Sequence, residues 1–212
     1  MPTLTKPTET GAPAPEVAQV HWKGGVSPFG VPWQKLMMWY FLVTDALLFA
    51  GFLASYGFIR LAVGTWPEQS DVFPMLKIGT MTFVLITSSA TMATAVGAVH
   101  RGDLRRATVF VFLTALGGLA FLLGQATEWA DLIREGARLT HNPWGPPPFA
   151  AFFFMITGFH GTHVLIGVLI LSIVAGRLRK GRATGLGVEV AGLYWHFVDV
   201  VWCFIFPLFY LL

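Results

Sequence analysis

The apolar residues of the chain are gathered into five long runs, separated by short segments rich in polar residues, Gly and Pro. A transmembrane helix needs roughly 20 apolar residues, because a rise of about 1.5 Å per residue must cover a hydrocarbon core of about 30 Å. The runs predict membrane-spanning helices over residues 35–61, 76–99, 108–129, 149–175 and 190–212. We therefore expect an all-α integral membrane protein, a bundle of five transmembrane helices.

The segment before the first run, residues 1–33, is rich in Pro and Thr. It lacks the charged stretch followed by an apolar stretch that marks a secretory signal peptide. We expect a flexible or surface-lying leader over residues 1–33 and a five-helix membrane domain over residues 34–212.

Composition agrees with a membrane protein: 55% of the residues are hydrophobic and 12% are charged. A soluble protein carries about twice that charged fraction. The net charge of +3 resides in short loops, so it is no sign of nucleic-acid binding. The single cysteine, Cys203, lies in an apolar run and supports neither a disulfide nor a thiolate metal cluster.

Basic residues are concentrated in the connections after the second and fourth runs: Arg101, Arg105, Arg106, Arg177, Arg179, Lys180 and Arg182. Loops rich in Lys and Arg stay in the cytoplasm. The N-terminus is therefore predicted to be cytoplasmic and the C-terminus periplasmic. The second run, over residues 87–98, is rich in Ser, Thr, Ala and Gly, which predicts close packing among its neighbours.

Five ionisable residues lie at comparable depth within the predicted spans: Asp45, His160, His163, His196 and Asp199. Such groups are expensive in a membrane and suggest function by default. The two histidines of the fourth span are three residues apart and share one helix face, as do His196 and Asp199.

Two further acids extend this polar set. Glu189 shares a stripe of the last helix with His196 and Asp199, at spacings of seven and ten residues. Glu128, beside Trp129, ends the third span near the outer interface.

Three interpretations of the polar residues compete. Carboxylates and histidines on several helices can hold a metal or haem, although the Glu-x-x-His pair of di-iron bundles is missing. Buried acids and histidines also mark proton or substrate pathways. The favoured interpretation is a structural network of interhelical hydrogen bonds. Its predicted members are Glu128, His160, His163, Glu189, His196 and Asp199.

Four segments resemble one protein family. Residues 194–202 read Tyr-Trp-His-Phe-Val-Asp-Val-Val-Trp, which is similar, almost letter for letter, to the last helix of the haem-copper oxidase subunit III family. Residues 158–164 resemble the family's Gly-x-His-Gly-x-His-Val motif. Residues 44–52 and the pair Gln125 and Glu128 resemble two further stretches. The resemblance covers residues 33–212 and is to the short, five-helix bacterial form.

The resemblance implies a non-redox subunit of a proton-pumping terminal oxidase in the bacterial inner membrane. Haem and copper would belong to subunits I and II, and this chain would carry no cofactor or metal of its own. It would dock on subunit I, with subunits II and IV as further partners. It would bind phospholipid and sustain proton uptake, so the enzyme activity would belong to the complex and not to this chain.

Two residues are candidates for lipid binding or proton uptake. Asp45 stands where the family has a buried Glu, and it is one methylene shorter. Arg177 stands where the family has an arginine facing a lipid phosphate, although it could equally serve only as a topology-setting charge. The chain also has five predicted helices and not the family's longer set of seven, so another subunit would supply one wall of the lipid cleft, or the cleft would be open.

Several other functions stay open at this point. A subunit of a quinol oxidase or an accessory protein of a nitric-oxide reductase would carry nearly the same motifs. A free-standing proton-coupled transporter could use Asp45, His196 and Asp199. An assembly or lipid-organising factor is a third class.

Overall fold

A computed structural model describes residues 29–212, and most of the predicted leader, residues 1–28, lies outside the described residues. The described chain is helical: α2 (Trp33–Ala62), the short α3 (Gln69–Val72), α4 (Met75–His100), α5 (Leu104–Arg134), α6 (Pro147–Arg179) and α7 (Gly185–Phe206). A π-helical segment, η1 (Pro207–Leu211), follows α7 directly. Five of these helices are long and apolar enough to cross a membrane, which confirms the predicted number of spans.

The helices extend beyond the predicted spans at most ends. α5 begins at Leu104, where Asp103 caps the helix by accepting a hydrogen bond from the Arg106 N–H at 3.0 Å. α7 begins at Gly185 after Thr184, whose hydroxyl accepts from the Gly187 N–H at 3.2 Å. Capping side chains fix where a helix starts, whereas hydropathy locates only its apolar middle. The predicted boundaries are therefore too short at these ends.

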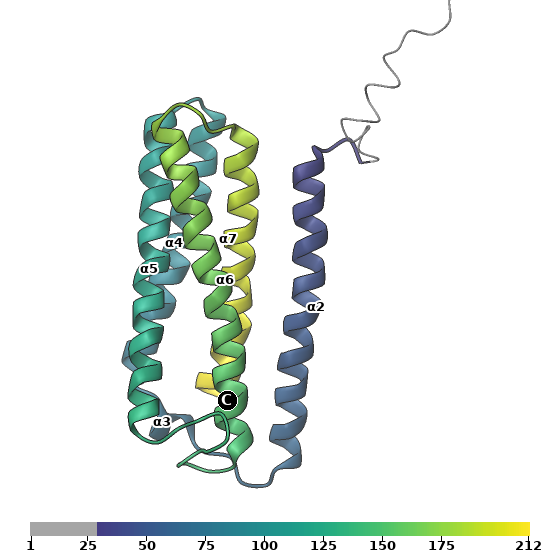
Figure 1. Cartoon of the computed structure of the whole chain (residues 1–212), viewed down its shortest axis with the longest axis vertical. Coiled ribbons are helices and arrows are strands. Elements are labelled where there is room, and N and C mark those ends of the chain that lie inside the picture. The colour runs from purple at the N-terminus through teal and green to yellow at the C-terminus, as the bar shows by residue number, and fades with distance from the viewer. Residues whose placement is uncertain (1–28) are drawn as a thin grey trace, which may run out of the picture.

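The long helices run up and down, so the bundle has two ends (Figure 1). The basic end carries the start of α2 and the connections after α4 and α6, with Arg101 and Lys180. The Pro-rich end carries α3, the connection between α5 and α6, and the C-terminus. Figure 1 shows α4, α5, α6 and α7 grouped together, with α2 standing to one side. α2 contacts α6 and α7.

Close approach of the helices depends on small residues. A Cβ added at Gly117 of α5 would lie 2.8 Å from the Ser88 Cβ of α4. A Cβ added at Gly118 would lie 2.3 Å from the buried ring of Trp195 of α7. Because these distances leave no room for a side chain, the glycines let Ser88 and Trp195 pack directly against the backbone of α5. The prediction that the second span packs closely among its neighbours is confirmed.

Candidate functional site

The contact between Asp45 of α2 and His163 of α6 is the best-defined ionisable pair inside the bundle. The Asp45 Oδ2 atom lies 3.3 Å from His163 Nε2, and the two side chains are only 9% and 10% exposed. The other ring nitrogen, Nδ1, lies 2.8 Å from the Phe159 carbonyl oxygen. A carbonyl oxygen only accepts hydrogen bonds, so Nδ1 must carry a proton there. Within residues 29–212 Asp45 Oδ2 makes no hydrogen bond. A hydrogen bond between it and Nε2 would need one more proton, either on Nε2 or on the carboxyl group.

Aromatic packing holds this pair in place. Phe49 lies one turn after Asp45 and contacts Phe159 and His163, with ring centroids 5.1 Å and 5.5 Å away. The Tyr194 hydroxyl of α7 donates to the His163 carbonyl oxygen at 3.0 Å. Three helices, α2, α6 and α7, therefore meet at the Asp45–His163 pair.

His160 has a different environment, although it shares a helix face with His163. Its side chain is 1% exposed and stacks on Trp202, with ring centroids 5.3 Å apart. The edge of Phe121 approaches at 5.8 Å. Within the described part of the chain, neither ring nitrogen of His160 has a hydrogen-bond partner. His160 is packed as an aromatic side chain, and the structure gives it no hydrogen bond to a network.

The two residues of the predicted pair on α7 have different environments, and His196 meets a hydroxyl on α4. The Ser89 Oγ atom lies 2.6 Å from His196 Nδ1. Asp199 is 7% exposed, and its Oδ1 atom has no partner within residues 29–212. Ser89 therefore connects α4 to His196 of α7.

Glu189 lies at the basic end, away from the other acids. It accepts a hydrogen bond from Lys35 Nζ at 2.7 Å and pairs with the ring of His100. These partners come from the start of α2 and the end of α4. Glu189 therefore ties three helices together at one end of the bundle.

Glu128 lies near the Pro-rich end and is 2% exposed. Its Oε2 atom accepts hydrogen bonds from Gln125 Nε2 at 2.6 Å and from the Tyr210 hydroxyl at 3.1 Å. The end of the chain is thereby attached to α5. The predicted network thus divides into separate contacts, each between different helices, and the role of each residue stays a prediction.

Sequence reasoning missed the partners Ser89, Lys35, His100 and Tyr210. Their only signal was their residue type, because no spacing rule pairs residues that lie 82 to 154 positions apart. Arg177, the second lipid-binding candidate, is exposed in the last turn of α6. Within residues 29–212, no carboxylate oxygen lies within 4.0 Å of its guanidinium nitrogens.

A metal centre finds no support in the described chain. Over residues 29–212, no group of three or more His, Cys, Asp or Glu side chains is placed to hold a metal ion. The buried ionisable residues instead lie against hydroxyls, an amide, aromatic rings and, for Asp45 and His163, one another.

Together, these features define a multi-pass helical membrane protein whose spans are joined by buried polar contacts. The sequence model for cytochrome c oxidase subunit III matches residues 29–212. The chain belongs to the cytochrome c oxidase subunit III family, as its motifs indicate.

Three relatives illustrate the match. The chain is 37% identical to cytochrome c oxidase subunit 3 of Synechocystis sp. over 177 residues, covering 81% of this chain and 72% of the relative. It is 35% identical to cytochrome c oxidase subunit 3 of Thermostichus vulcanus, covering 81% and 84%. It is also 35% identical to quinol oxidase subunit 3 of Bacillus spizizenii, covering 84% and 86%. The prediction of a haem-copper oxidase subunit III is confirmed.

Proposed function

We propose that this chain is the non-redox subunit of a proton-pumping terminal oxidase. It docks on subunit I, beside subunit II and, where one is present, subunit IV. Haem and copper reside in those partners, and this chain sustains proton uptake and binds phospholipid. The observation that carries the proposal is the buried contact between Asp45 and His163, in a chain of the subunit III family.

The Asp45–His163 pair suits a role in proton uptake for a chemical reason. The pair can hold one proton on either partner, since the other nitrogen of His163 is committed to the Phe159 carbonyl. A carboxyl–imidazole pair that binds and releases a proton inside a membrane is costly and is typical of proton-handling sites. The short Asp side chain reaches His163 directly, so the missing methylene does not prevent the contact.

Phospholipid binding is proposed at Arg177 and along the apolar surface of α2. Arg177 offers a guanidinium group at the basic end of α6, where a phosphate can accept two hydrogen bonds from it. α2 exposes large apolar side chains on the outside of the bundle, among them Leu47, Phe58 and Leu61. Lipid tails or the helices of a partner subunit would cover them.

The membrane orientation is part of the proposal. The basic connections after α4 and α6 support a cytoplasmic basic end, which places the N-terminus in the cytoplasm and the C-terminus in the periplasm. Residues 34–212 then form the membrane domain of a bacterial inner-membrane protein.

The test replaces Asp45 with Asn in the complete oxidase complex. Asn keeps the shape but cannot exchange a proton at neutral pH. We expect the complex to assemble with its haem spectrum unchanged, and to lose activity after fewer turnovers than the parent. The control is Asp131→Asn, an exposed carboxylate at the Pro-rich end. Equal turnover durability in both variants would reject the role of Asp45, and failure of the chain to co-purify with a haem-containing subunit I would reject the assignment as a whole.

The electron donor is a separate question within this proposal. Relatives named as cytochrome c oxidase and as quinol oxidase subunits match this chain at 37% and 35% identity. Donor choice resides largely in the other subunits, so an assay of the purified complex with reduced cytochrome c and with a quinol decides it. Oxidation of the quinol alone would favour a quinol oxidase.

A further inference from the structure

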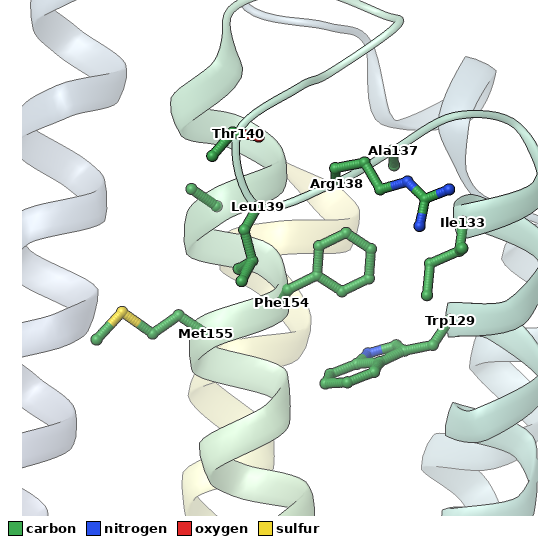
Figure 2. A pocket seen from close by; sticks show the side chains of 9 residues that line it. Trp129, Ile133, Ala137, Arg138, Leu139, Thr140, Phe154 and Met155 are labelled. Atoms are coloured by element: carbon green, nitrogen blue, oxygen red, sulfur yellow. The ribbon is translucent and has the colours of Figure 1, made fainter.

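A pocket of about 870 Å³ opens between α5 and α6 at the Pro-rich end. Figure 2 shows the rings of Trp129 and Phe154 on one side of it and the guanidinium group of Arg138 toward the connecting loop. Its volume lies in the range of roughly 300–1,000 Å³ that is typical of small-molecule sites. The pocket lies at the opposite end of α6 from Arg177, so it is separate from the lipid site proposed above.

The apolar part of the pocket is held rigidly. Trp129 Nε1 donates a hydrogen bond to the Thr157 hydroxyl at 3.1 Å, which fixes the indole ring against α6. Phe154 meets that ring edge to face, with centroids 5.2 Å apart. Ile133 and Leu139, which also line the pocket, are 38% and 62% exposed. A preformed apolar surface of this kind is unfavourable in water and suits a hydrocarbon chain.

The polar part of the pocket consists of one cation and one hydroxyl. Arg138 is the single charged residue among those that line it, and Thr140 adds a hydroxyl. Within residues 29–212, Arg138 takes part in no side-chain ion pair. The neighbouring Arg134, by contrast, lies 3.7 Å from Asp131. Arg138 therefore has its full charge available for an anion.

We propose that this pocket binds an anionic phospholipid, with the phosphate at Arg138 and Thr140 and an acyl chain against Trp129 and Phe154. An arginine forms paired hydrogen bonds with phosphate oxygens, which gives it an advantage over a neutral donor. The lining matches the two parts of such a lipid: one positive end at the loop and an apolar remainder along the helices. On the proposed orientation, the lipid comes from the periplasmic leaflet. This site goes beyond the proposed function, because it is separate from the lipid site at Arg177. Its test measures lipid retention without turnover, so its failure can be told apart from a failure of the proposed function.

The test uses the purified oxidase complex in nanodiscs made of equal parts phosphatidylglycerol and phosphatidylcholine. Retained lipid is counted by native mass spectrometry after mild delipidation. The parent should retain phosphatidylglycerol in preference, and Arg138→Gln should lower that preference about fivefold. Arg134→Gln is the matched control, since Arg134 does not line the pocket and should leave the preference unchanged. Equal retention of both lipids by the parent would overturn the proposal, as would an equal effect of the two variants.

A second measurement separates a lipid from a partner protein. A photoreactive benzoylphenylalanine at Ile133, on the pocket wall, should crosslink to a phospholipid. A crosslink to another chain of the complex would show that a subunit fills the pocket, and would overturn the proposal. Ala151→Phe, which adds a ring to the pocket lining, should reduce retention of both lipids at this site. If that variant fails to assemble, the Arg138→Gln comparison and the crosslink still decide the question.

Discussion

The hydroxyl group of Tyr210, near the end of the chain, donates a hydrogen bond to the buried carboxyl group of Glu128 at 3.1 Å, across 82 residues of sequence. Tyr210 itself is fully buried, and it also contacts Phe73 and Trp202. The π-helical end of the chain is thereby fixed to α5 and to the segment before α4.

Removing this hydroxyl should destabilise the subunit. Tyr210→Phe keeps the ring but leaves one fewer donor for a buried carboxyl group, and a lost partner of this kind costs about 1–3 kcal/mol. The expected result is a lower thermal unfolding midpoint of the purified complex. Tyr40→Phe is the control, because Tyr40 is 55% exposed. Equal midpoints for Tyr210→Phe and the parent would show that the bond contributes nothing to stability.

The contact between Lys35 and Glu189 should contribute only modestly. Their side chains are 33% and 21% exposed, so solvent and salt screen the pair. An exposed ion pair contributes about 0.2–1 kcal/mol. A double-mutant cycle with Lys35→Met and Glu189→Gln should give a coupling energy in that range, and the coupling should shrink as salt is added. A coupling energy that salt does not change would mean that the pair is shielded from solvent in the complex.

The fold could be read from the sequence because five apolar runs and the small residues of α4 depend only on local pattern. The hydrogen-bond partners of the buried polar groups could not be predicted from the sequence. Spacing gives the face of a helix on which His196 lies, but it does not give the neighbour that the face meets, which is Ser89. Only the packing of α4 against α7 decides that.

Glu189 illustrates a second limit. It shares a stripe with His196, but seven residues of helix displace it by roughly 10 Å along the axis. It therefore meets Lys35 and His100 at the basic end and not the polar groups farther along α7. His160 illustrates a third limit: its residue type predicted a hydrogen bond, whereas its ring packs against Trp202 and Phe121.

Ser89 should matter more for stability than its residue type suggests. Because its hydroxyl is the hydrogen-bond partner of His196 Nδ1, Ser89→Ala should cost about 1 kcal/mol by leaving that half-buried nitrogen without its partner. His196 keeps its partner Ser89 when Asp199 is replaced by Leu. Asp199→Leu should therefore cost less than a substitution that leaves His196 unpaired. The measurement is the unfolding midpoint of the complex in detergent. Ser55→Ala is the control, since Ser55 is exposed and bonds only to its own helix, at Gly51; a midpoint loss for Ser55→Ala as large as for Ser89→Ala would contradict the assignment.

The close contact of Gly118 with side chains of α6 and α7 gives the sharpest test of the packing. An added Cβ would lie 2.3 Å from the Trp195 ring, and 2.7 Å from a methyl group of Val168. Gly118→Ala should therefore force α5 away from α6 and α7, at a cost of about 1–3 kcal/mol for overpacking. Gly57→Ala in α2 is the matched control, because an added Cβ there meets nothing within 4 Å, and Ala favours a helix more than Gly. We expect a lower yield of assembled complex and a lower unfolding midpoint for Gly118→Ala alone. If both alanine variants behave as the parent does, the three helices do not meet as closely as described.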